Sequence, residues 1–287
     1  NEVKIEKNQK AINKKEYYLI ENLEQIDNWI TEAEELGEVA VDTETNSLDP
    51  HQADLVGVSL SSKIGKACYI PIGHKSNKCI EKDLVLKKLK PLLEDPSIKK
   101  IGQNIKFDFI VFFKHGINMT SMEDTMLMSY VLDAGKNRHN MDTLSEIHLN
   151  HKTISFKDLV GTGKKEINFS EVDVEKAKDY AAEDADITFR LYKKFQKSLK
   201  DEKMINIYEI FEKPLLKILA FMEIEGVKID NKFLKSLSTK FEKKIVKIQN
   251  EVFKISKKEF NIASPKQLGE ILYNDLKIAD LKKTKKG

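Results

Sequence analysis

Four carboxylates in three separated motifs are the residues of this chain best suited to chemistry. Asp42 and Glu44 stand in VDTET, Asp108 in GQNIKFD and Asp184 in YAAEDAD, and Tyr180 precedes Asp184 by one helical turn. Acid groups carried by three different elements can converge on a pair of divalent cations, which is a common device for cleaving phosphodiester bonds. Because the chain has 46 acidic residues, only the order, spacing and neighbours of these four are informative.

Asp42 and Glu44 lie two residues apart in segment 38–45, whose alternating apolar residues predict a β-strand. Their side chains should therefore point to one face of a sheet, and those of Val39 and Val41 to the other. Two acids on one face repel each other unless a cation bridges them. A solvated strand end is the simpler interpretation of such a pair in isolation. The apolar character of the strand favours a central position, where unpaired acids are rare.

Asn104 and Asp108 are four residues apart at the start of a predicted helix. They share one face near its positive end, which favours anions. Asn104 is suited to be the N-cap, an ordinary structural role. Asp108 stands between Phe107 and Phe109, where a carboxylate without a partner is costly.

Tyr180 and Asp184 repeat the four-residue spacing on a helix predicted over 173–199. A tyrosine hydroxyl beside a metal-bound carboxylate can orient an attacking water. Taken alone, the two residues are more typical of a surface pair. Glu183 and Asp186 point to other faces of this helix, and we expect them to be solvated or structural.

The elements predicted around these motifs form an α/β domain with a mixed sheet of about five strands and helices on both faces. Short polar connections favour antiparallel pairing of the first three strands. Segment 150–172 is expected to be irregular. The predicted strands are 38–45, 54–62, 66–73 and 98–104, and the predicted helices are 22–36, 83–94, 105–116, 123–133, 140–149 and 173–199.

Residues 201–287 have a different pattern, which predicts helices. Segment 203–225 is helical, and Pro214 should kink it or start a new helix. Segment 231–258 has apolar residues three or four apart with lysines on the other face, and a shorter helix over 264–274 begins with Ser264 as N-cap. We expect a helical hairpin that packs poorly alone.

Charge is unevenly distributed along the 287 residues. Residues 201–287 contain 19 Lys, no Arg and 13 acidic residues, a net +6, whereas residues 1–200 contain 30 basic and 33 acidic residues. An acidic front and a basic back suit a metal-binding catalytic domain followed by an arm that contacts phosphates. AT-biased coding is an equally good explanation of the lysine usage.

Composition also excludes several classes of protein. No apolar run approaches the ~20 residues of a membrane-spanning helix, and the polar first ten residues are unlike a signal peptide. Cys68 and Cys79 are too few for a disulfide framework or a zinc site, so we expect free thiols. These features predict a cytoplasmic protein with no membrane partner.

Together the three motifs and Tyr180 resemble the DEDD exonuclease superfamily, in its tyrosine-bearing branch, which has a ribonuclease H-like fold. VDTETNSLD, IGQNIKFD, EDTMLMSYVLDAGKNRHNMDTL, HKTISFKDLVGTGKK and YAAEDADIT look like the proofreading 3′–5′ exonuclease of bacterial DNA polymerase I. FEKPLLKILAFMEIEGVKID and FNIASPKQLGEILYNDL look like the start of the family A polymerase portion, where thumb helices arise. The polar, lysine-rich start of the chain predicts a tail at 1–16, and the resemblance implies an exonuclease domain at 17–200 and thumb helices at 201–287.

This resemblance assigns the carboxylates to two divalent cations, Mg²⁺ or Mn²⁺, which fit all-oxygen ligands. Asp42, Glu44 and Asp184 would hold the first cation. Asp42 would bridge to the second, which Asp108 would reach through water. Tyr180 and Glu44 would help the first cation to orient and deprotonate a water, and the second would stabilise the leaving 3′ oxygen. The product would be a 5′-nucleoside monophosphate.

The same resemblance implies contacts to DNA. Leu48 matches a position that wedges against terminal bases. Phe107 stands where tyrosine is more usual and keeps a stacking surface. His139 and His148 are expected to be packing or surface residues. The predicted contacts to the single strand are Leu48, Gln103, Asn104, Phe107 and Arg138, and those to the duplex backbone are Lys243, Lys244, Lys282, Lys283, Lys285 and Lys286.

Three functions remain open from sequence. The first is a 3′–5′ exonuclease on DNA, acting as a monomer on a single-stranded 3′ end with the duplex at the thumb. The second is an RNA-trimming exonuclease like ribonuclease D, since metal chemistry ignores the 2′-hydroxyl, although the thumb-like segment disfavours it. The third is a non-catalytic DNA-binding scaffold. The chain contains no polymerase palm carboxylate motif, so we expect that it alone does not synthesise DNA.

Overall fold

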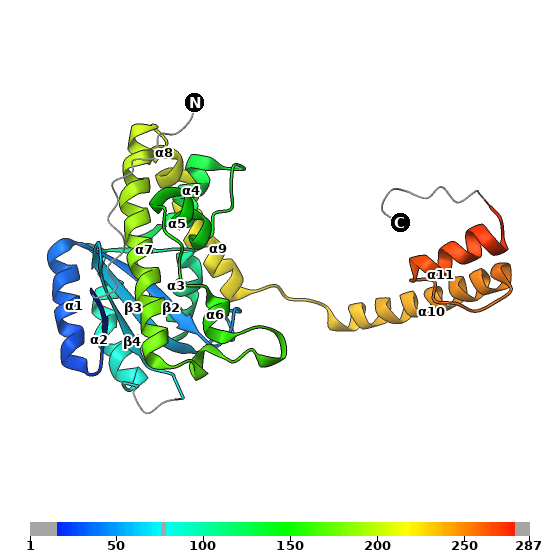
Figure 1. Ribbon diagram of the computed structural model, residues 1–287, viewed down its shortest axis with the longest axis horizontal. Coiled ribbons are helices and arrows are strands. Elements are labelled where there is room, and N and C mark those ends of the chain that lie inside the picture. Colours follow the sequence, from blue (N-terminus) through cyan, green and yellow to red (C-terminus); the bar gives the residue numbers. More distant parts are fainter. Residues whose placement is uncertain (1–15, 76–78, 279–287) are drawn as a thin grey trace. The chain divides into compact units, whose positions relative to one another are not determined.

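The computed structural model describes residues 16–75 and 79–278 and divides the chain into two units (Figure 1). The first unit ends at Gly226 and contains the sheet, and the second begins at Val227 and is helical. The first therefore carries all four carboxylates of the three motifs. Among the described residues, no helix combines the length and the apolar character needed to cross a membrane.

The sheet has six strands in the spatial order β1-β4-β3-β2-β5-β6. The central pairs β2–β3 and β3–β4 are antiparallel, as predicted, while β5 and β6 continue the sheet parallel to β2, and β1 runs parallel to β4. The mixed α/β fold is confirmed, with six strands in place of about five. The strands are β1 (Tyr17–Leu19), β2 (Glu38–Thr45), β3 (Leu55–Lys63), β4 (Lys66–Pro71), β5 (Lys99–Gly102) and β6 (Met122–Asp124).

Helices cover both faces of this sheet. Helices α1, α2, α3 and α9 share one apolar core with the sheet, and α4, α5 and α7 share another. The helices are α1 (Leu23–Leu36), α2 (Lys82–Glu94), α3 (Ile105–Lys114), α4 (Thr125–Asp133), α5 (Met141–Leu149), α6 (Phe156–Val160), α7 (Val174–Asp201), α8 (Ile205–Ile207) and α9 (Lys213–Glu225). Three short turns of other helix types are η2 (Gly163–Lys165), η3 (Phe169–Glu171) and η4 (Tyr208–Glu212). Segment 150–172, predicted to be irregular, thus contains α6, η2 and η3.

Strand β2 alternates between the two cores. Val39 and Val41 are fully buried in the core shared with α1, α2 and α3, whereas Ala40 packs with residues of α7. Because side chains alternate along a strand, Asp42 and Glu44 continue the face of Ala40 and point toward α7. The predicted division of β2 into an apolar face and an acidic face is therefore confirmed.

Helix α7 is buried around most of its circumference, and two of its acids are structural. Asp186 is fully buried and accepts hydrogen bonds from the Tyr17 hydroxyl at 2.9 Å and the Gly65 amide at 2.8 Å. Glu183 is also fully buried and accepts from the Ile154 amide at 2.6 Å. Both residues therefore have structural roles, which was one of the two predictions, and the other prediction, that they are solvated, is wrong.

Helices α8 and α9, with the turn η4 between them, belong to the first unit and pack within it. Pro214 lies in the first turn of α9, directly after the π-helical turn η4, and the backbone stays helical from η4 into α9. The Tyr208 hydroxyl donates to Glu123 at 2.9 Å, and the Phe221 ring contacts the rings of Phe109 and Phe113 on α3. These contacts fix α9 against α3, the helix that carries Asp108.

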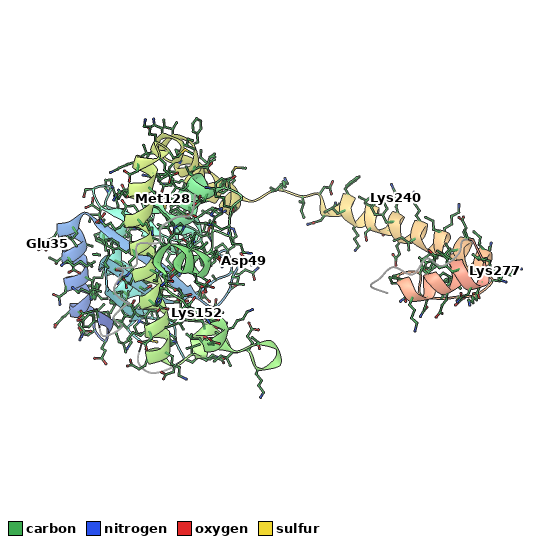
Figure 2. The ribbon with its side chains drawn as sticks, turned by 45° about the horizontal axis from the view of Figure 1, so that its top comes forward. Glu35, Asp49, Met128, Lys152, Lys240 and Lys277 are labelled. Carbon is green, nitrogen blue, oxygen red and sulfur yellow. The ribbon has the colours of Figure 1, made fainter. Side chains whose placement is uncertain are left out.

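The second unit consists of α10 (Asn231–Ser256), α11 (Pro265–Gly269) and the π-helical turn η5 (Glu270–Asp275). Ser264 caps α11 by accepting from the Gln267 amide, as predicted. Near the end of α10, Phe253 packs on Phe260 with ring centroids 5.9 Å apart. Earlier in α10, Phe233 and Ile245 belong to the apolar residues spaced three or four apart, and both are more than half exposed. The Lys240 side chain projects from the same part of the helix (Figure 2).

Candidate active site

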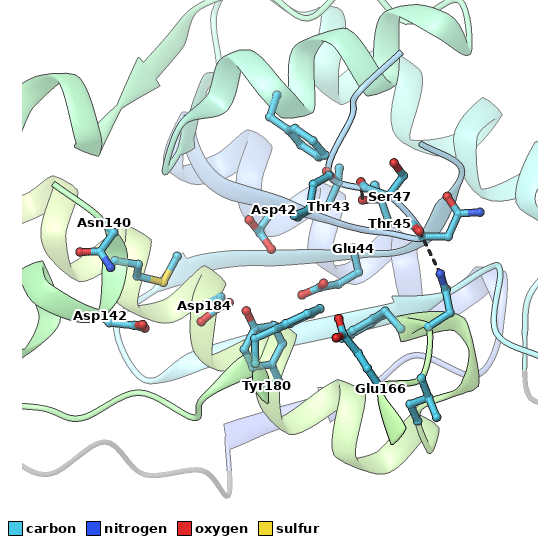
Figure 3. A pocket seen from close by; sticks show the side chains of 18 residues that line it. Asp42, Thr43, Glu44, Thr45, Ser47, Asn140, Asp142, Glu166, Tyr180 and Asp184 are labelled. Carbon is cyan, nitrogen blue, oxygen red and sulfur yellow. Dashed lines mark hydrogen bonds between the residues drawn. The ribbon is translucent and has the colours of Figure 1, made fainter. Parts of the chain in front are cut away.

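A cavity of about 520 Å³ opens on the α7 side of β2. Its walls come from β2 and the loop that follows it, α3, the N-terminus of α5, α6, residues 166–169 and α7 (Figure 3). Six of the predicted site residues meet here although they lie up to 142 positions apart in sequence. The predicted residues that line the cavity are Asp42, Glu44, Leu48, Phe107, Tyr180 and Asp184.

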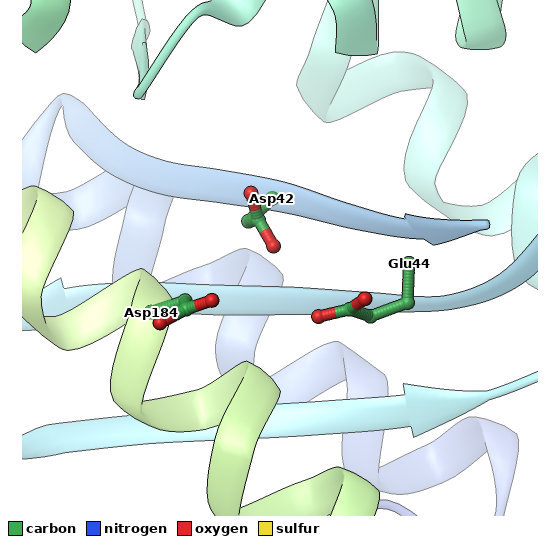
Figure 4. A group of neighbouring side chains, drawn as sticks. All are labelled: Asp42, Glu44 and Asp184. Carbon is green, nitrogen blue, oxygen red and sulfur yellow. The ribbon is translucent and has the colours of Figure 1, made fainter. Parts of the chain in front are cut away.

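Three carboxylates form a cluster on one wall of this cavity. Asp42 and Glu44 come from β2 and Asp184 from α7, and one oxygen from each lies within 4.8 Å of the others (Figure 4). Glu44 and Asp184 are 7% exposed. Such an all-oxygen set of partly enclosed carboxylates suits a hard divalent cation.

Electrostatics make this cluster unfavourable without a cation. Burial raises the pKa of Asp42 to about 7. Burial and then the charge of Asp42 raise the pKa values of both Glu44 and Asp184 well above their usual range. The Oε1 atom of Glu44 is buried and has no hydrogen-bond partner among the described residues. Because an unpaired buried carboxylate oxygen is costly, the donor set fits a bound cation.

Asp108 lies behind this cluster and does not line the cavity. Its Oδ1 atom accepts two hydrogen bonds from Thr43, one from the amide at 3.0 Å and one from the hydroxyl at 2.5 Å. Burial and then the charge of Asp42 raise its pKa. Thr43 stands between Asp42 and Glu44 on β2 and so links Asp108 to both. Sequence reasoning missed Thr43, although its place inside VDTET was a usable signal.

Tyr180 stands one turn before Asp184 on α7, and its hydroxyl is hydrogen-bonded to that carboxylate. Burial and then the charge of Asp184 raise the pKa of the phenol far above its ordinary value. The ring is fixed by Phe156 and Phe169, with centroids 6.0 and 6.1 Å away. Burial therefore keeps the Tyr180 phenol protonated near neutral pH, where it can donate a hydrogen bond.

Gln103, Asn104 and Arg138 do not line the cavity. The Gln103 side chain donates to the His139 carbonyl at 2.7 Å, and Arg138 is exposed. Asn104 occupies the N-cap position of α3 with a left-handed φ of 63°, but its side chain makes no capping bond. Asp124 caps this helix instead, accepting from the amides of Asn104 and Ile105 at 3.1 Å each.

The remaining predicted residues lie elsewhere. Lys243 and Lys244 are exposed on α10 of the second unit, and Lys282, Lys283, Lys285 and Lys286 lie outside the described residues. The packing role expected for two histidines agrees with their contacts. His139 bonds to the Ser129 hydroxyl at 2.9 Å, and His148 packs edge-on against Phe195 at 4.8 Å.

The structure also brings residues into the cavity that the sequence did not single out. They include Asp142 on α5 and four residues of segment 150–172, which are Phe156 on α6 and Glu166, Asn168 and Phe169 around η3. Asp142 accepts from the Thr153 hydroxyl at 2.6 Å, which ties α5 to the following loop. Most of these residues belong to segment 150–172, whose path over the site depends on contacts that are distant in sequence.

Two family models match different parts of the chain. Residues 17–200 match the family model described as 3′–5′ exonuclease, and residues 231–287 match that of DNA polymerase family A. The chain is 41% identical over 293 residues to DNA polymerase I of Rhizobium leguminosarum. That similarity covers 94% of this chain and 29% of the relative, so the chain spans less than a third of the relative's length.

Two solved structures resemble the fold. The POL domain of Pol1 from M. smegmatis, in complex with DNA primer-template and dNTP, gives a TM-score of 0.72 at 20% identity and covers 94% of this chain and 43% of that chain. Brucella melitensis NrnC with bound Mg²⁺ gives a TM-score of 0.54 at 25% identity and covers 74% of this chain and 96% of that one. The match of the exonuclease model over most of the chain shows that this protein belongs to the 3′–5′ exonuclease family.

Proposed function

We propose that the first unit hydrolyses the terminal phosphodiester bond at DNA 3′ ends with two divalent cations, releasing 5′-nucleoside monophosphates. The observation that carries this proposal is the cluster of Asp42, Glu44 and Asp184, in which a buried Glu44 oxygen has no partner among the described residues. Bound cations would offset the mutual repulsion of these carboxylates once they are ionised. In this proposal residues 17–200 are the exonuclease domain and residues 201–287 begin a polymerase domain.

Each carboxylate has a place in this proposal. Asp42, Glu44 and Asp184 would hold one Mg²⁺ or Mn²⁺, and Asp42 would be shared with a second ion near Asp108. Bound cations would supply the charge that activates a water and stabilises the leaving 3′ oxygen. Thr43 would keep Asp108 in place through its two hydrogen bonds.

Tyr180 and the apolar residues of the cavity would position the substrate. Because burial raises the pKa of its phenol, Tyr180 would donate a hydrogen bond to orient the attacking water and would not act as the base. Phe107 and Leu48 line the same cavity and offer apolar surfaces to the terminal bases. Gln103, Asn104 and Arg138 remain proposed contacts to the strand further from the reaction.

Replacing Tyr180 by phenylalanine should lower kcat for DNA degradation about 10- to 100-fold, the value of one well-placed hydrogen bond in the transition state. The ring and its contacts with Phe156 and Phe169 would be kept. The measurement is the pH–rate profile of both proteins from pH 6 to 10. We expect a lower curve of unchanged shape. A limb that disappears from the profile would show instead that Tyr180 itself titrates during catalysis.

The basic second unit would hold the duplex through sequence-independent contacts. We propose that Lys243 and Lys244, exposed on α10, each neutralise a phosphate, and that the four lysines over 282–286 do the same. The double variant Lys243→Gln/Lys244→Gln should reduce the slope of log Kd against log salt by about 2 for duplex DNA. Fluorescence anisotropy between low and moderate salt measures that slope. An unchanged slope would mean that these lysines only solvate the helix.

An RNA substrate is the second candidate, because the metal chemistry does not read the 2′-hydroxyl. The match of residues 231–287 to DNA polymerase family A favours DNA. Degradation rates of DNA and RNA oligonucleotides of the same sequence distinguish the two, and faster degradation of RNA would reject our choice. We further propose that the protein acts as a monomer in the cytoplasm. A non-catalytic scaffold is disfavoured because all four carboxylates are present.

A further inference from the structure

Leu48 is an apolar side chain held in solvent at the mouth of the cavity. It is 93% exposed and yet lines the cavity that contains the carboxylate cluster. Two hydrogen bonds between Asn46 and Asp54 close the base of its loop. The Asn46 amide donates to the Asp54 carbonyl at 3.1 Å, and the Asp54 amide donates to the Asn46 side chain at 2.8 Å. Within the loop the Thr45 hydroxyl donates to the Ser47 carbonyl at 2.8 Å. Leu48 therefore sits on a structured loop.

Asn168 joins this loop to the opposite rim of the cavity. Its Nδ2 atom donates to the Asn46 carbonyl at 2.9 Å. Its Oδ1 atom accepts from the Ser170 amide at 3.0 Å and caps the turn η3, and the Glu171 side chain completes the capping box. The two partners fix the orientation of the amide group, because an amide N–H needs an acceptor and a carbonyl needs a donor. One side chain thus performs two separable tasks.

The turn that carries Asn168 is itself anchored to the segment after β4 and to Tyr180. The Lys75 amide donates to the Ser170 carbonyl at 2.8 Å, and the His74 Nδ1 donates to the Val172 carbonyl at 3.1 Å. Phe169, next to Asn168, is 3% exposed and packs against Tyr180. The bond from Asn168 to Asn46 therefore ties the loop of Leu48 to a turn that is fixed relative to Tyr180.

We propose that Asn168 is a positioning residue that holds Leu48 at the distance from the carboxylate cluster needed to capture a separated duplex end. This inference rests on the proposed exonuclease function. A duplex 3′ end must lose pairing and stacking before its last phosphodiester reaches the cluster, at a cost of about a few kcal/mol. An apolar wedge offsets that cost only if it is held in place. A single strand has no pairing to lose, so its degradation should depend little on Asn168.

The test separates the two tasks of Asn168. Asn168→Ser keeps an oxygen that can cap η3 but is too short to reach Asn46, and Asn168→Asp keeps the cap and loses the Nδ2 donor. Asn118→Asp, an exposed position that does not line the cavity, controls for the added charge. Substrates are a single-stranded oligonucleotide and a fully paired duplex with the same 3′ sequence. Thermal unfolding of each variant checks that the fold is retained.

For Asn168→Ser and Asn168→Asp we expect kcat/KM on the duplex to fall about five- to tenfold, with less than a twofold change on the single strand. Asn118→Asp should match the unaltered protein on both. Leu48→Ala should lose more kcat/KM on the duplex than on the single strand, and adding Asn168→Ser to it should cause little further loss on the duplex, because both act on one step. Equal losses on both substrates, or additive losses, would overturn the inference. If the unaltered protein degraded neither substrate, the proposed function would fail first.

Discussion

Replacing Asp42 by asparagine is expected to lower the rate of nucleotide release by on the order of 10⁴-fold, a loss typical of removing a central catalytic group. Asp42 is the member of the cluster whose charge also acts on Glu44, Asp108 and Asp184. The amide removes an anionic ligand while keeping the shape of the side chain. The measurement is single-turnover degradation of a 5′-labelled DNA oligonucleotide in saturating Mg²⁺.

Two comparisons make this result interpretable. Glu166→Gln removes one negative charge from the same cavity outside the carboxylate cluster, and should change the rate by less than about threefold. Single-strand affinity of Asp42→Asn should be kept or slightly improved, because repulsion of the phosphates is reduced. Undiminished cleavage in Asp42→Asn would refute the assignment of the cluster as the catalytic centre.

Removing divalent cations is expected to abolish nucleotide release and also to change how stability depends on pH. In the metal-free protein the pKa of Asp42 is about 7, against an ordinary value of 3.8. The folded chain therefore binds this proton more tightly than the unfolded chain, so the free energy of unfolding falls as pH rises from about 4 to about 7 and stays lower above that. Burial raises the pKa values of Glu44, Asp108 and Asp184 as well, which extends the fall to higher pH.

Thermal unfolding at pH 5.5 and pH 8 in a chelator, and again with Mg²⁺, tests this prediction. We expect Tm without metal to be lower at pH 8 by roughly 5 °C or more, and Mg²⁺ to raise Tm most at pH 8, because the cation binds the ionised acids. Asp42→Asn should flatten the metal-free dependence. A metal-free protein that is more stable at pH 8 than at pH 5.5 would contradict the electrostatic description of the cavity.

Periodicity was sufficient to predict the part of the site that lies on β2. Alternation in a single strand determines which face each residue takes, so the separation of Val39 and Val41 from Asp42 and Glu44 followed from sequence. Strands β1 and β6 were not predicted, because three residues are too few to show an alternating pattern. The convergence of Asp184 on β2 was inferred from motif order and family resemblance, since spacing alone does not bring α7 to the sheet.

The sequence could not predict the burial and hydrogen bonding of side chains whose neighbours come from distant segments of the chain. Glu183 and Asp186 occupy different faces of α7, but that helix is enclosed by the sheet and by α4 and α5, so both faces are buried. Asn104 looked like a capping residue, yet Asp124 takes its role from 20 positions away. Asn168 is another example, because its bond to Asn46 crosses 122 residues. In each case the interacting residues are far apart in the sequence, so no local sequence pattern predicts the contact.

The most direct test of the proposed function is the identity of the product. A DNA oligonucleotide labelled at its 5′ end should shorten one nucleotide at a time from the 3′ end, only with Mg²⁺ or Mn²⁺, and the released product should be 5′-nucleoside monophosphate. Chromatography against standards with 5′ and 3′ phosphates gives the answer. Internal fragments, 3′-monophosphates or release that continues in a chelator would contradict a cation-dependent 3′–5′ exonuclease centred on Asp42, Glu44 and Asp184.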